Sequence, residues 1–204
     1  MASTTSASGS RPGGRSARVR AQVLQATGAQ LVEQGYDALT VDAVAERAGV
    51  HRTTVYRRWR DVGGLLADLL EAAADDSWEP ADTGTLEGDL TALNEEILAG
   101  VTADPPLTTA LIAASFRSAQ AADALRAFWE DRYARCAVVA ARAEQRGELP
   151  AGTRSRDLLV AATAPLYHEL VLLGTPPTPH LPATAARTAA AAARAGAFTG
   201  PVDE

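Results

Sequence analysis

The chain has 204 residues, of which 47% are hydrophobic, 22% charged and 5% aromatic, a composition typical of a folded protein with one large or two small domains. Ala is the most frequent residue and all 19 basic residues are Arg, which favours helix over strand. No apolar run exceeds six residues, which excludes a membrane-spanning helix. Residues 1–16 lack the apolar stretch of a signal peptide, and the single cysteine, Cys136, excludes an internal disulfide. We therefore expect a cytoplasmic, all-α protein.

Charge divides the chain in two. Residues 1–60 hold nine Arg against four acidic residues, a net charge of +5, whereas residues 61–204 carry a net charge of −11. A basic end joined to an acidic body favours a protein whose first part meets a polyanion and whose second part has a separate task. A chance clustering of solvated Arg is the alternative that charge alone leaves open.

An arm over residues 1–15 precedes a helix-turn-helix domain over residues 16–62. The arm consists mostly of Ser, Thr, Gly, Pro and Arg, too polar to bury a core, so we expect it to be disordered and to carry Arg11. A helix is predicted from Ser16 to Gln34, with Gly35 at the position of a C-cap.

Two short helices around a glycine turn follow. Thr40 is placed to cap a helix whose apolar residues recur at i, i+3, i+4 and i+7 from Val41, and Gly49 closes it. A further helix begins near His51 and runs through Trp59. Two helices so closely spaced form a helix-turn-helix.

Residues 63–204 are predicted to form a second, helical domain. Segments with Pro and Gly, which stop helices, separate its elements, and the whole chain should contain about nine helices. The predicted helices of this domain are Leu65–Trp78, Leu86–Val101, Leu107–Arg117, Ala121–Arg146, Ser155–Leu173 and Ala183–Ala197.

The helix that ends at Trp59 has two unlike sides. Val55, Trp59 and Val62 fall on one side and should pack on the preceding helix. The other side offers hydroxyl, phenol and guanidinium groups, which can bind base edges and phosphates in a major groove. A solvated polar face on a core helix is the alternative. The outward residues are Thr53, Tyr56, Arg57 and Arg60.

The pattern of these helices is that of a known family. Gly35-Tyr36, Thr40-Val41, the run Val44–Val50, the run Thr54–Trp59 and Leu65-Leu66 together resemble the DNA-binding segment of the TetR family of bacterial transcriptional regulators. The resemblance implies a homodimer whose recognition helices enter successive major grooves of double-stranded operator DNA. It also implies a helical body that binds a small effector. We expect a repressor that a small, largely apolar compound releases from a palindromic operator.

The resemblance further implies which side chains contact DNA. Thr40 is expected to contact a phosphate at the start of its helix. The base-facing set is Arg52, Thr53, Thr54 and Arg57, and the phosphate contacts on the same helix are Tyr56 and Arg58.

Two positions depart from the family pattern. Family members commonly have Ser or Thr where this chain has His51, which caps a helix less well unless its ring bonds the backbone. They also commonly have Lys where this chain has Val62. Arg60 is one candidate to replace that phosphate contact. The arm from Arg11 to Arg20, lying along a minor groove, is the other, and a free arm is the alternative.

No catalytic, metal or cofactor site is predicted. His168-Glu169 begins like a zinc-protease motif, but the position of its second His holds Leu172. Cys136 precedes an Ala-Val-Val run and is expected to be a buried thiol that acts as a small apolar residue. An all-α enzyme and a plain interaction protein with a solvated basic face remain the alternative classes.

Scarce aromatic residues in the second domain suggest where an effector binds. In this family such helices would enclose a pocket, and Arg132 and Glu169 could orient a ligand in it. A core role is the alternative for each aromatic residue. The predicted pocket residues are Phe116, Phe128, Trp129, Tyr133 and His168, with Trp78 as a further aromatic residue.

The last two helices, at about residues 155–173 and 183–197, are predicted to form the homodimer interface. An interface of two helices from each subunit would make a four-helix bundle, and small Ala side chains would let the helices approach closely. The stripes expected to meet are Leu158, Ala162, Leu166, Leu170 and Leu173 in one helix and Ala186, Ala190, Ala193 and Ala197 in the other.

Overall fold

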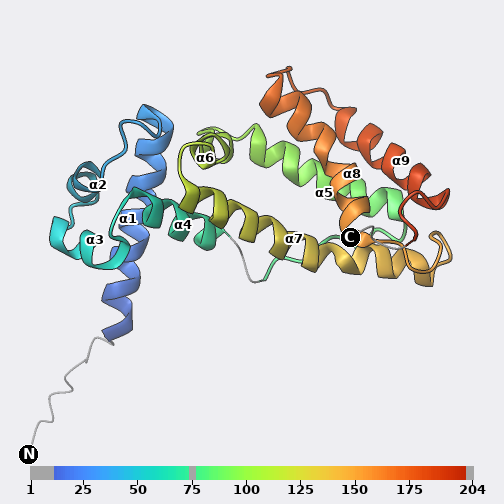
Figure 1. Ribbon diagram of the computed structural model, residues 1–204, viewed down its shortest axis with the longest axis horizontal. Coiled ribbons are helices and arrows are strands. Elements are labelled where there is room, and N and C mark those ends of the chain that lie inside the picture. Colours follow the sequence, from blue (N-terminus) through green and yellow to red (C-terminus); the bar gives the residue numbers. More distant parts are fainter. Residues whose placement is uncertain (1–11, 74–76, 201–204) are drawn as a thin grey trace, which may run out of the picture.

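The computed structural model describes residues 12–73 and 77–200, and in these ranges the chain forms nine α-helices and one short π-helix (Figure 1). The all-α prediction is confirmed. None of the described helices is long and apolar enough to cross a membrane. The helices are α1 (Pro12–Gln34), α2 (Val41–Ala48), α3 (Arg52–Trp59), α4 (Val62–Ala73), α5 (Leu86–Val101), α6 (Leu107–Ser115), α7 (Ala119–Gln145), α8 (Ser155–Tyr167), the π-helix (His168–Leu172) and α9 (Leu181–Arg194).

The helices enclose two apolar cores. The first lies among α1–α4 and takes in Leu111 of α6 and Ala121 of α7. The second lies among α5, α7, α8 and α9, where Cys136 and Val139 of α7 are buried. Because α7 contributes to both cores, it joins the end of the molecule formed by α1–α3 to the body formed by α5, α8 and α9 (Figure 1).

Side-chain caps set the starts of the two short helices. Thr40 Oγ1 accepts a hydrogen bond from the Ala43 N–H across 3.2 Å at the start of α2. At the start of α3, His51 Nδ1 accepts one from the Thr53 N–H across 3.4 Å. The imidazole therefore caps α3 in place of the Ser or Thr side chain expected there.

The N-terminal limit of α1 differs from the prediction. Residues 12–15, predicted to belong to a disordered arm, are helical. Pro12 fits the first turn of a helix, because an N–H in that turn has no intrahelical acceptor and proline therefore loses no hydrogen bond. The remainder of the predicted arm, with Arg11, lies outside the described residues.

The limits of α4 also differ from the prediction. The helix starts at Val62 and not at Leu65, because Asp61 Oδ1 accepts a hydrogen bond from the Gly64 N–H across 2.9 Å and caps it. Trp78, predicted as its last residue, lies outside the helix. Pro80 follows closely, and a proline disfavours helix in the residue before it.

The predicted helix Ser155–Leu173 is divided in two. Pro165 lies inside α8 and lacks the N–H that would continue the hydrogen-bond ladder. The chain then widens into the π-helix, in which the Leu173 N–H donates to the His168 carbonyl across 3.0 Å.

The stripes predicted for dimer contact are mostly buried inside the chain, so the prediction is wrong about these faces. α9 packs on α5 and α8, and its small Ala side chains allow that close approach. A partner chain can reach the opposite sides of α8 and α9 and the exposed ends of the two stripes, Leu173 and Ala197. The residues with 0% exposure are Leu158, Ala162 and Leu166 in α8 and Ala186, Ala190 and Ala193 in α9.

Candidate functional site

Helix α3 presents a polar surface at one end of the molecule. Val55 and Trp59 are buried in the first core, whereas most polar residues of the helix project to solvent. The buried and exposed sides of α3 are those predicted from the sequence. Among the residues predicted to contact DNA, Thr40, Arg52, Thr53, Tyr56, Arg57, Arg58 and Arg60 are exposed.

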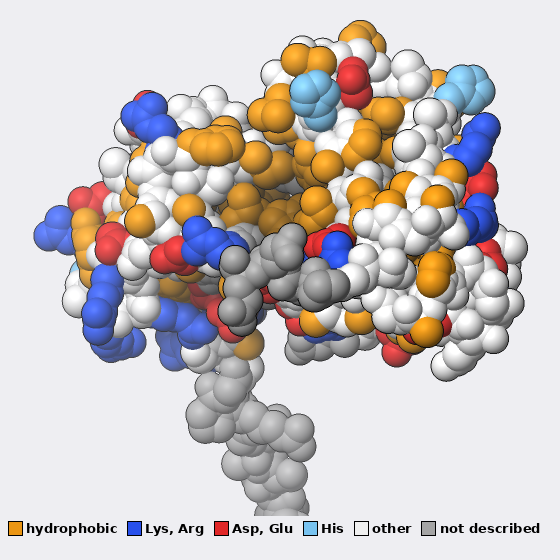
Figure 2. Space-filling model, turned by 45° about the vertical axis from the view of Figure 1, so that its right-hand side comes forward, with side chains coloured by type: hydrophobic (Ala, Val, Ile, Leu, Met, Phe, Trp, Pro, Cys, Tyr) orange, Lys and Arg blue, Asp and Glu red, His pale blue; other side chains and the backbone are white. Residues whose placement is uncertain are grey.

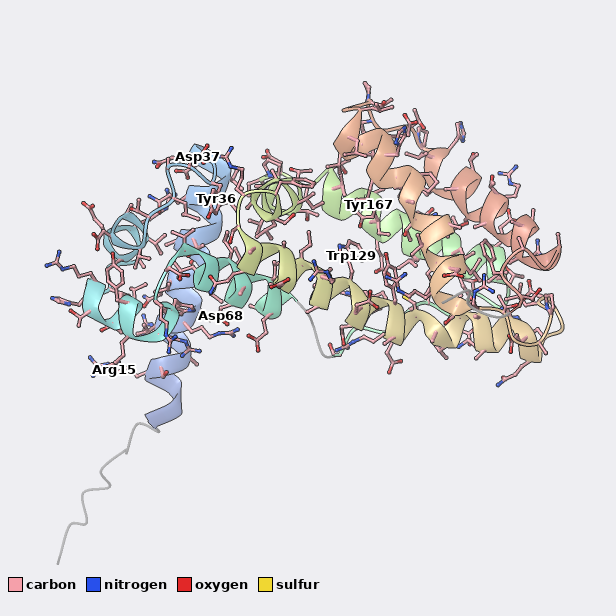
Figure 3. The ribbon with its side chains drawn as sticks, viewed as in Figure 1. Arg15, Tyr36, Asp37, Asp68, Trp129 and Tyr167 are labelled. Atoms are coloured by element: carbon pink, nitrogen blue, oxygen red, sulfur yellow. The ribbon has the colours of Figure 1, made fainter. Side chains whose placement is uncertain are left out.

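Arg side chains gather at the end formed by α1–α3 (Figure 2). Between α1 and α3 lies a groove of about 470 Å³, lined by Arg15, Arg57 and Arg58 among others. Thr54, predicted to face bases, is half-buried and lines this groove beside α1. Arg15, predicted in the arm, lies on α1 next to α3 (Figure 3). Guanidinium groups grouped in this way can bind phosphate oxygens.

Asp68 of α4 joins three helices (Figure 3). Its carboxylate accepts hydrogen bonds from Arg20 Nε of α1 across 3.0 Å and from the Trp59 indole N–H of α3 across 2.6 Å. Burial alone would raise the pKa of Asp68, but these hydrogen bonds and the charges of Arg20 and Arg58 outweigh it, so the pKa lies below its usual value. Arg58, predicted to bind a phosphate, has its Nε 3.9 Å from this carboxylate.

The turn between α3 and α4 is tight. Arg60 has φ 62° and ψ −53°, and the Asp61 N–H donates to the Trp59 carbonyl across 2.6 Å, which makes this a γ-turn of the strained form. A Cβ added at Gly64 would lie 2.2 Å from the same carbonyl oxygen. Only glycine therefore lets α4 begin this close to the end of α3.

A cavity of about 180 Å³ lies in the body between α5, α7 and α8. Trp129 of α7 and Tyr167 of α8 form one wall, with their ring centroids 5.3 Å apart and their planes at 82° (Figure 3). Phe128 packs edge-on against Trp129, with centroids 5.4 Å apart. The cavity is thus enclosed mainly by aromatic and aliphatic side chains, as small-molecule sites commonly are.

The structure separates the predicted pocket residues. Phe128, Trp129 and Tyr133 line the cavity. His168 instead lines an adjacent groove of about 460 Å³, which shares Trp129 and Tyr133 with the cavity. Phe116 is 77% exposed at the end of α6, so its assignment to the pocket is wrong. The chain turns toward α7 at that point and leaves the ring in solvent.

The two charged residues that line the cavity, Glu96 and Arg132, both contact Trp78. Its indole N–H donates to Glu96 Oε2 across 2.8 Å, and the Arg132 guanidinium carbon lies 4.0 Å from the centroid of its ring. Burial raises the pKa of Cys136 to about 11 and raises the pKa of Tyr167. The thiol is buried, as predicted, and both groups are neutral at pH 7.

Sequence reasoning missed two residues. Tyr167 follows Pro165 and Leu166, and its place in the cavity depends on how α8 packs on α7. Asp68 has a signal in the sequence, since it is a lone carboxylate in the apolar run from Leu65 to Leu70. Within the part of the chain that the structure describes, no three side chains of metal-binding type come together.

Two segments of the chain match known protein families. Residues 23–69, which include α2, α3 and most of α4, match bacterial regulatory proteins of the tetR family. Residues 80–189, which include every lining residue of the cavity except Trp78, match the tetracyclin repressor-like C-terminal domain.

Individual proteins are similar along most of their length. The HTH-type transcriptional regulator AqdR of Rhodococcus erythropolis is 36% identical over 172 residues, 82% of this chain and 82% of that protein. The DNA-binding transcriptional repressor TetR of Mycobacteroides abscessus is 34% identical over 163 residues, 78% of this chain and 84% of its own. The crystal structure of the TetR family transcription regulator SCO0332 has a TM-score of 0.64 at 27% identity, covering 85% of this chain and 97% of that one.

Proposed function

The chain belongs to the TetR family of bacterial regulatory proteins, and on that basis we propose that it is a repressor of transcription. Membership makes it a DNA-binding transcriptional regulator and not an enzyme. The proposal adds that the chain acts in the cytoplasm, binds a palindromic operator as a homodimer, and leaves it when a small, largely apolar effector enters the cavity. The similar repressor from Mycobacteroides abscessus supports repression over activation.

The exposed face of α3 is the observation that carries the DNA-binding part. Arg57 and Arg52 offer paired N–H donors that suit guanine, and Tyr56 offers a hydroxyl that suits a phosphate oxygen. Val55 and Trp59 anchor the helix in the first core, so this face is held rigidly outward. Arg15, on α1, extends the basic surface beside it.

Contacts at the two ends of the segment from Gly64 to Trp78 support control by the cavity. Trp78 lines the cavity five residues after α4 ends at Ala73. At the other end of α4, Gly64 abuts the Trp59 carbonyl, and Asp68 holds the Trp59 indole. On this proposal, a ligand that moves Trp78 acts through α4 on α3. It releases DNA only if it binds the released form more tightly than the bound form.

The outward sides of α8 and α9 support the proposed homodimer. Both helices lie together on the outer side of the body (Figure 1). Their exposed residues include small and polar side chains, which allow close packing of helices from two subunits. These residues are Arg156 and Ala164 on α8 and Thr184, Arg187, Thr188 and Ala191 on α9.

A footprint on genomic fragments selected by the full-length protein tests the DNA-binding part. We expect protection of a nearly palindromic site with two half-sites about one helical turn apart. Arg57→Ala should relax the sequence preference, since such a contact gives ~1–3 kcal/mol of discrimination, whereas Tyr56→Phe should weaken all sites alike. An unchanged footprint for Arg57→Ala would show that α3 does not read the site. Absence of DNA binding at low salt would favour a plain interaction protein.

A further inference from the structure

Arg132 of α7 is the unusual charged group of the body. It lines the apolar cavity, with its guanidinium carbon 4.0 Å from the Trp78 ring centroid and 5.3 Å from that of Phe128. Within the described residues it has neither a hydrogen bond nor an ion pair, although its side chain is only partly exposed. A charge placed among apolar groups without a partner is costly, so a ligand that supplies one gains affinity.

Other Arg residues of the same body are already paired. Arg126 bonds to Asp123 across 2.7 Å, Arg146 to Glu148 across 2.7 Å, and Arg156 to Glu130 across 2.7 Å. Arg132 differs because its contacts are with ring faces. Stacking occupies the faces of a planar guanidinium and leaves the N–H donors on its edges able to bind a carboxylate bidentately.

Apart from Glu96, the described residues that line the cavity carry no negative charge at pH 7. Cys136, one helical turn from Arg132, and Tyr133 both carry protons at pH 7, since burial raises their pKa. Glu96 is exposed, and its carboxylate accepts the Trp78 indole N–H. The cavity thus combines apolar walls with the positive charge of Arg132 and with the exposed carboxylate of Glu96, which is already hydrogen-bonded to Trp78.

We propose that this cavity takes a small amphipathic organic anion, a monocarboxylate whose carboxylate binds Arg132 and whose apolar body packs against Trp129 and Tyr167. The proposal rests on the effector function above and names its ligand class. Organic cations are disfavoured because Arg132 already lies over the Trp78 and Phe128 faces that a cation would use. The volume of about 180 Å³ is below the roughly 300–1,000 Å³ of drug-sized sites, which limits the body to about one ring.

Three matched probes test the charge preference directly. 3-Phenylpropionate, 3-phenylpropionamide and 3-phenylpropylamine share one apolar body and differ in charge. Their affinities for the full-length protein, without DNA, are measured by titration calorimetry and by quenching of Trp emission, since Trp78 and Trp129 line the cavity. We expect the acid to bind at least about tenfold more tightly than the amide, the advantage of a charge-assisted hydrogen bond, and the amine to bind least.

Variants assign the preference to Arg132. Arg132→Met should reduce the acid-to-amide ratio to about one and leave amide affinity within a few-fold, whereas Arg126→Met, on the same helix at an exposed pair, should keep the ratio. Glu96→Gln keeps an acceptor for Trp78 and removes the nearby negative charge, so it should tighten acid binding. This second variant keeps the test valid if Arg132→Met fails to fold.

The outcomes separate this inference from the proposed function. Equal affinities for acid and amide, an acid preference that survives Arg132→Met, or no binding of any probe at millimolar concentration would overturn the inference. If the acid binds through Arg132 but leaves operator affinity unchanged, the inference stands and control by the cavity fails. If the amide releases DNA as well as the acid does and Arg132→Met has no effect, control by the cavity stands and the ligand class is wrong.

Discussion

Trp59, the last residue of α3, donates its indole N–H to the carboxylate of Asp68 in α4 across 2.6 Å. The same carboxylate accepts hydrogen bonds from Arg20 of α1. The polar surface of α3 is therefore oriented by the helix that leads toward the cavity. A change in the position of α4 can reach α3 through this short, charge-assisted contact as well as through the apolar core that the two helices share.

Removing the charge of Asp68 should destabilise the protein. We expect Asp68→Asn to lower the free energy of unfolding by about 2 kcal/mol, since hydrogen bonds to charged groups contribute roughly 1.5–3 kcal/mol each and Arg20 loses its partner. Urea denaturation at pH 7 measures the change. Asp123→Asn is the matched control, because its pair with Arg126 is exposed and should matter little. Equal losses in the two variants would contradict the assigned role.

The same carboxylate should make stability depend on pH. Because the pKa of Asp68 is lowered in the folded protein, its contribution is present above the usual carboxyl pKa and is lost as the pH falls through the lower folded value. The difference in urea midpoint between wild type and Asp68→Asn should be constant from pH 7 to about 5 and shrink below about pH 4. A difference in urea midpoint that grows as the pH falls would contradict a lowered pKa for Asp68 in the folded protein.

Substitution of Gly64 by Ala should destabilise the protein far more than the same substitution at its neighbour Gly63. A Cβ at Gly64 would lie 2.2 Å from the backbone oxygen of Trp59, so Gly64→Ala should cost about 1–3 kcal/mol and weaken DNA binding by displacing α3. At Gly63 the added Cβ would lie 1.9 Å from Gln120 Oε1, at the end of a side chain that can turn away, and 3.0 Å from Gln120 Cβ, which needs only a small shift. Thermal unfolding and operator affinity of the two variants make the comparison. Similar effects in both would rule out the close approach of α3 and α4 as the cause.

Arg15 should contribute one phosphate contact. It lines the groove beside α3 together with Arg57, so Arg15→Ala should weaken binding to every DNA sequence alike. The slope of log K against log salt should become shallower by about 0.9. Arg126→Ala, at an exposed ion pair in the first part of α7, provides the control with an unchanged slope. An identical slope for Arg15→Ala would mean that this end of α1 does not touch DNA.

Local chemistry made the helix-turn-helix predictable. Thr40, Gly49 and the alternation of buried and exposed residues on α3 act within a few residues of one another, so the sequence pattern specifies them. The aromatic residues of α7 could likewise be assigned to the cavity, because one stripe of a helix faces one neighbour. His51 could be identified as a weak point but not as a cap, since that depends on the direction of its ring.

The remaining features depend on packing between distant segments. The Ala stripe of α9 is equally suited to a partner chain and to α5, and the structure shows that α5 covers it. Phe116 is an aromatic residue of the kind that lines pockets, yet it lies where α6 ends and the chain turns. Asp68 meets Arg20 across 48 residues of sequence, a pairing that no spacing rule predicts.

Operator affinity measured with and without a cavity ligand tests most directly whether the cavity controls α3. A compound that raises the melting temperature is chosen first, and fluorescence anisotropy of a labelled operator duplex then gives the affinity. In the wild type we expect the ligand to weaken binding by about 5- to 150-fold, the usual range of coupling between sites. Trp129→Ala, which alters the cavity wall, should bind the operator normally and lose this response. If stabilising ligands leave wild-type operator affinity unchanged, the cavity does not control α3 and the protein is a constitutive DNA binder.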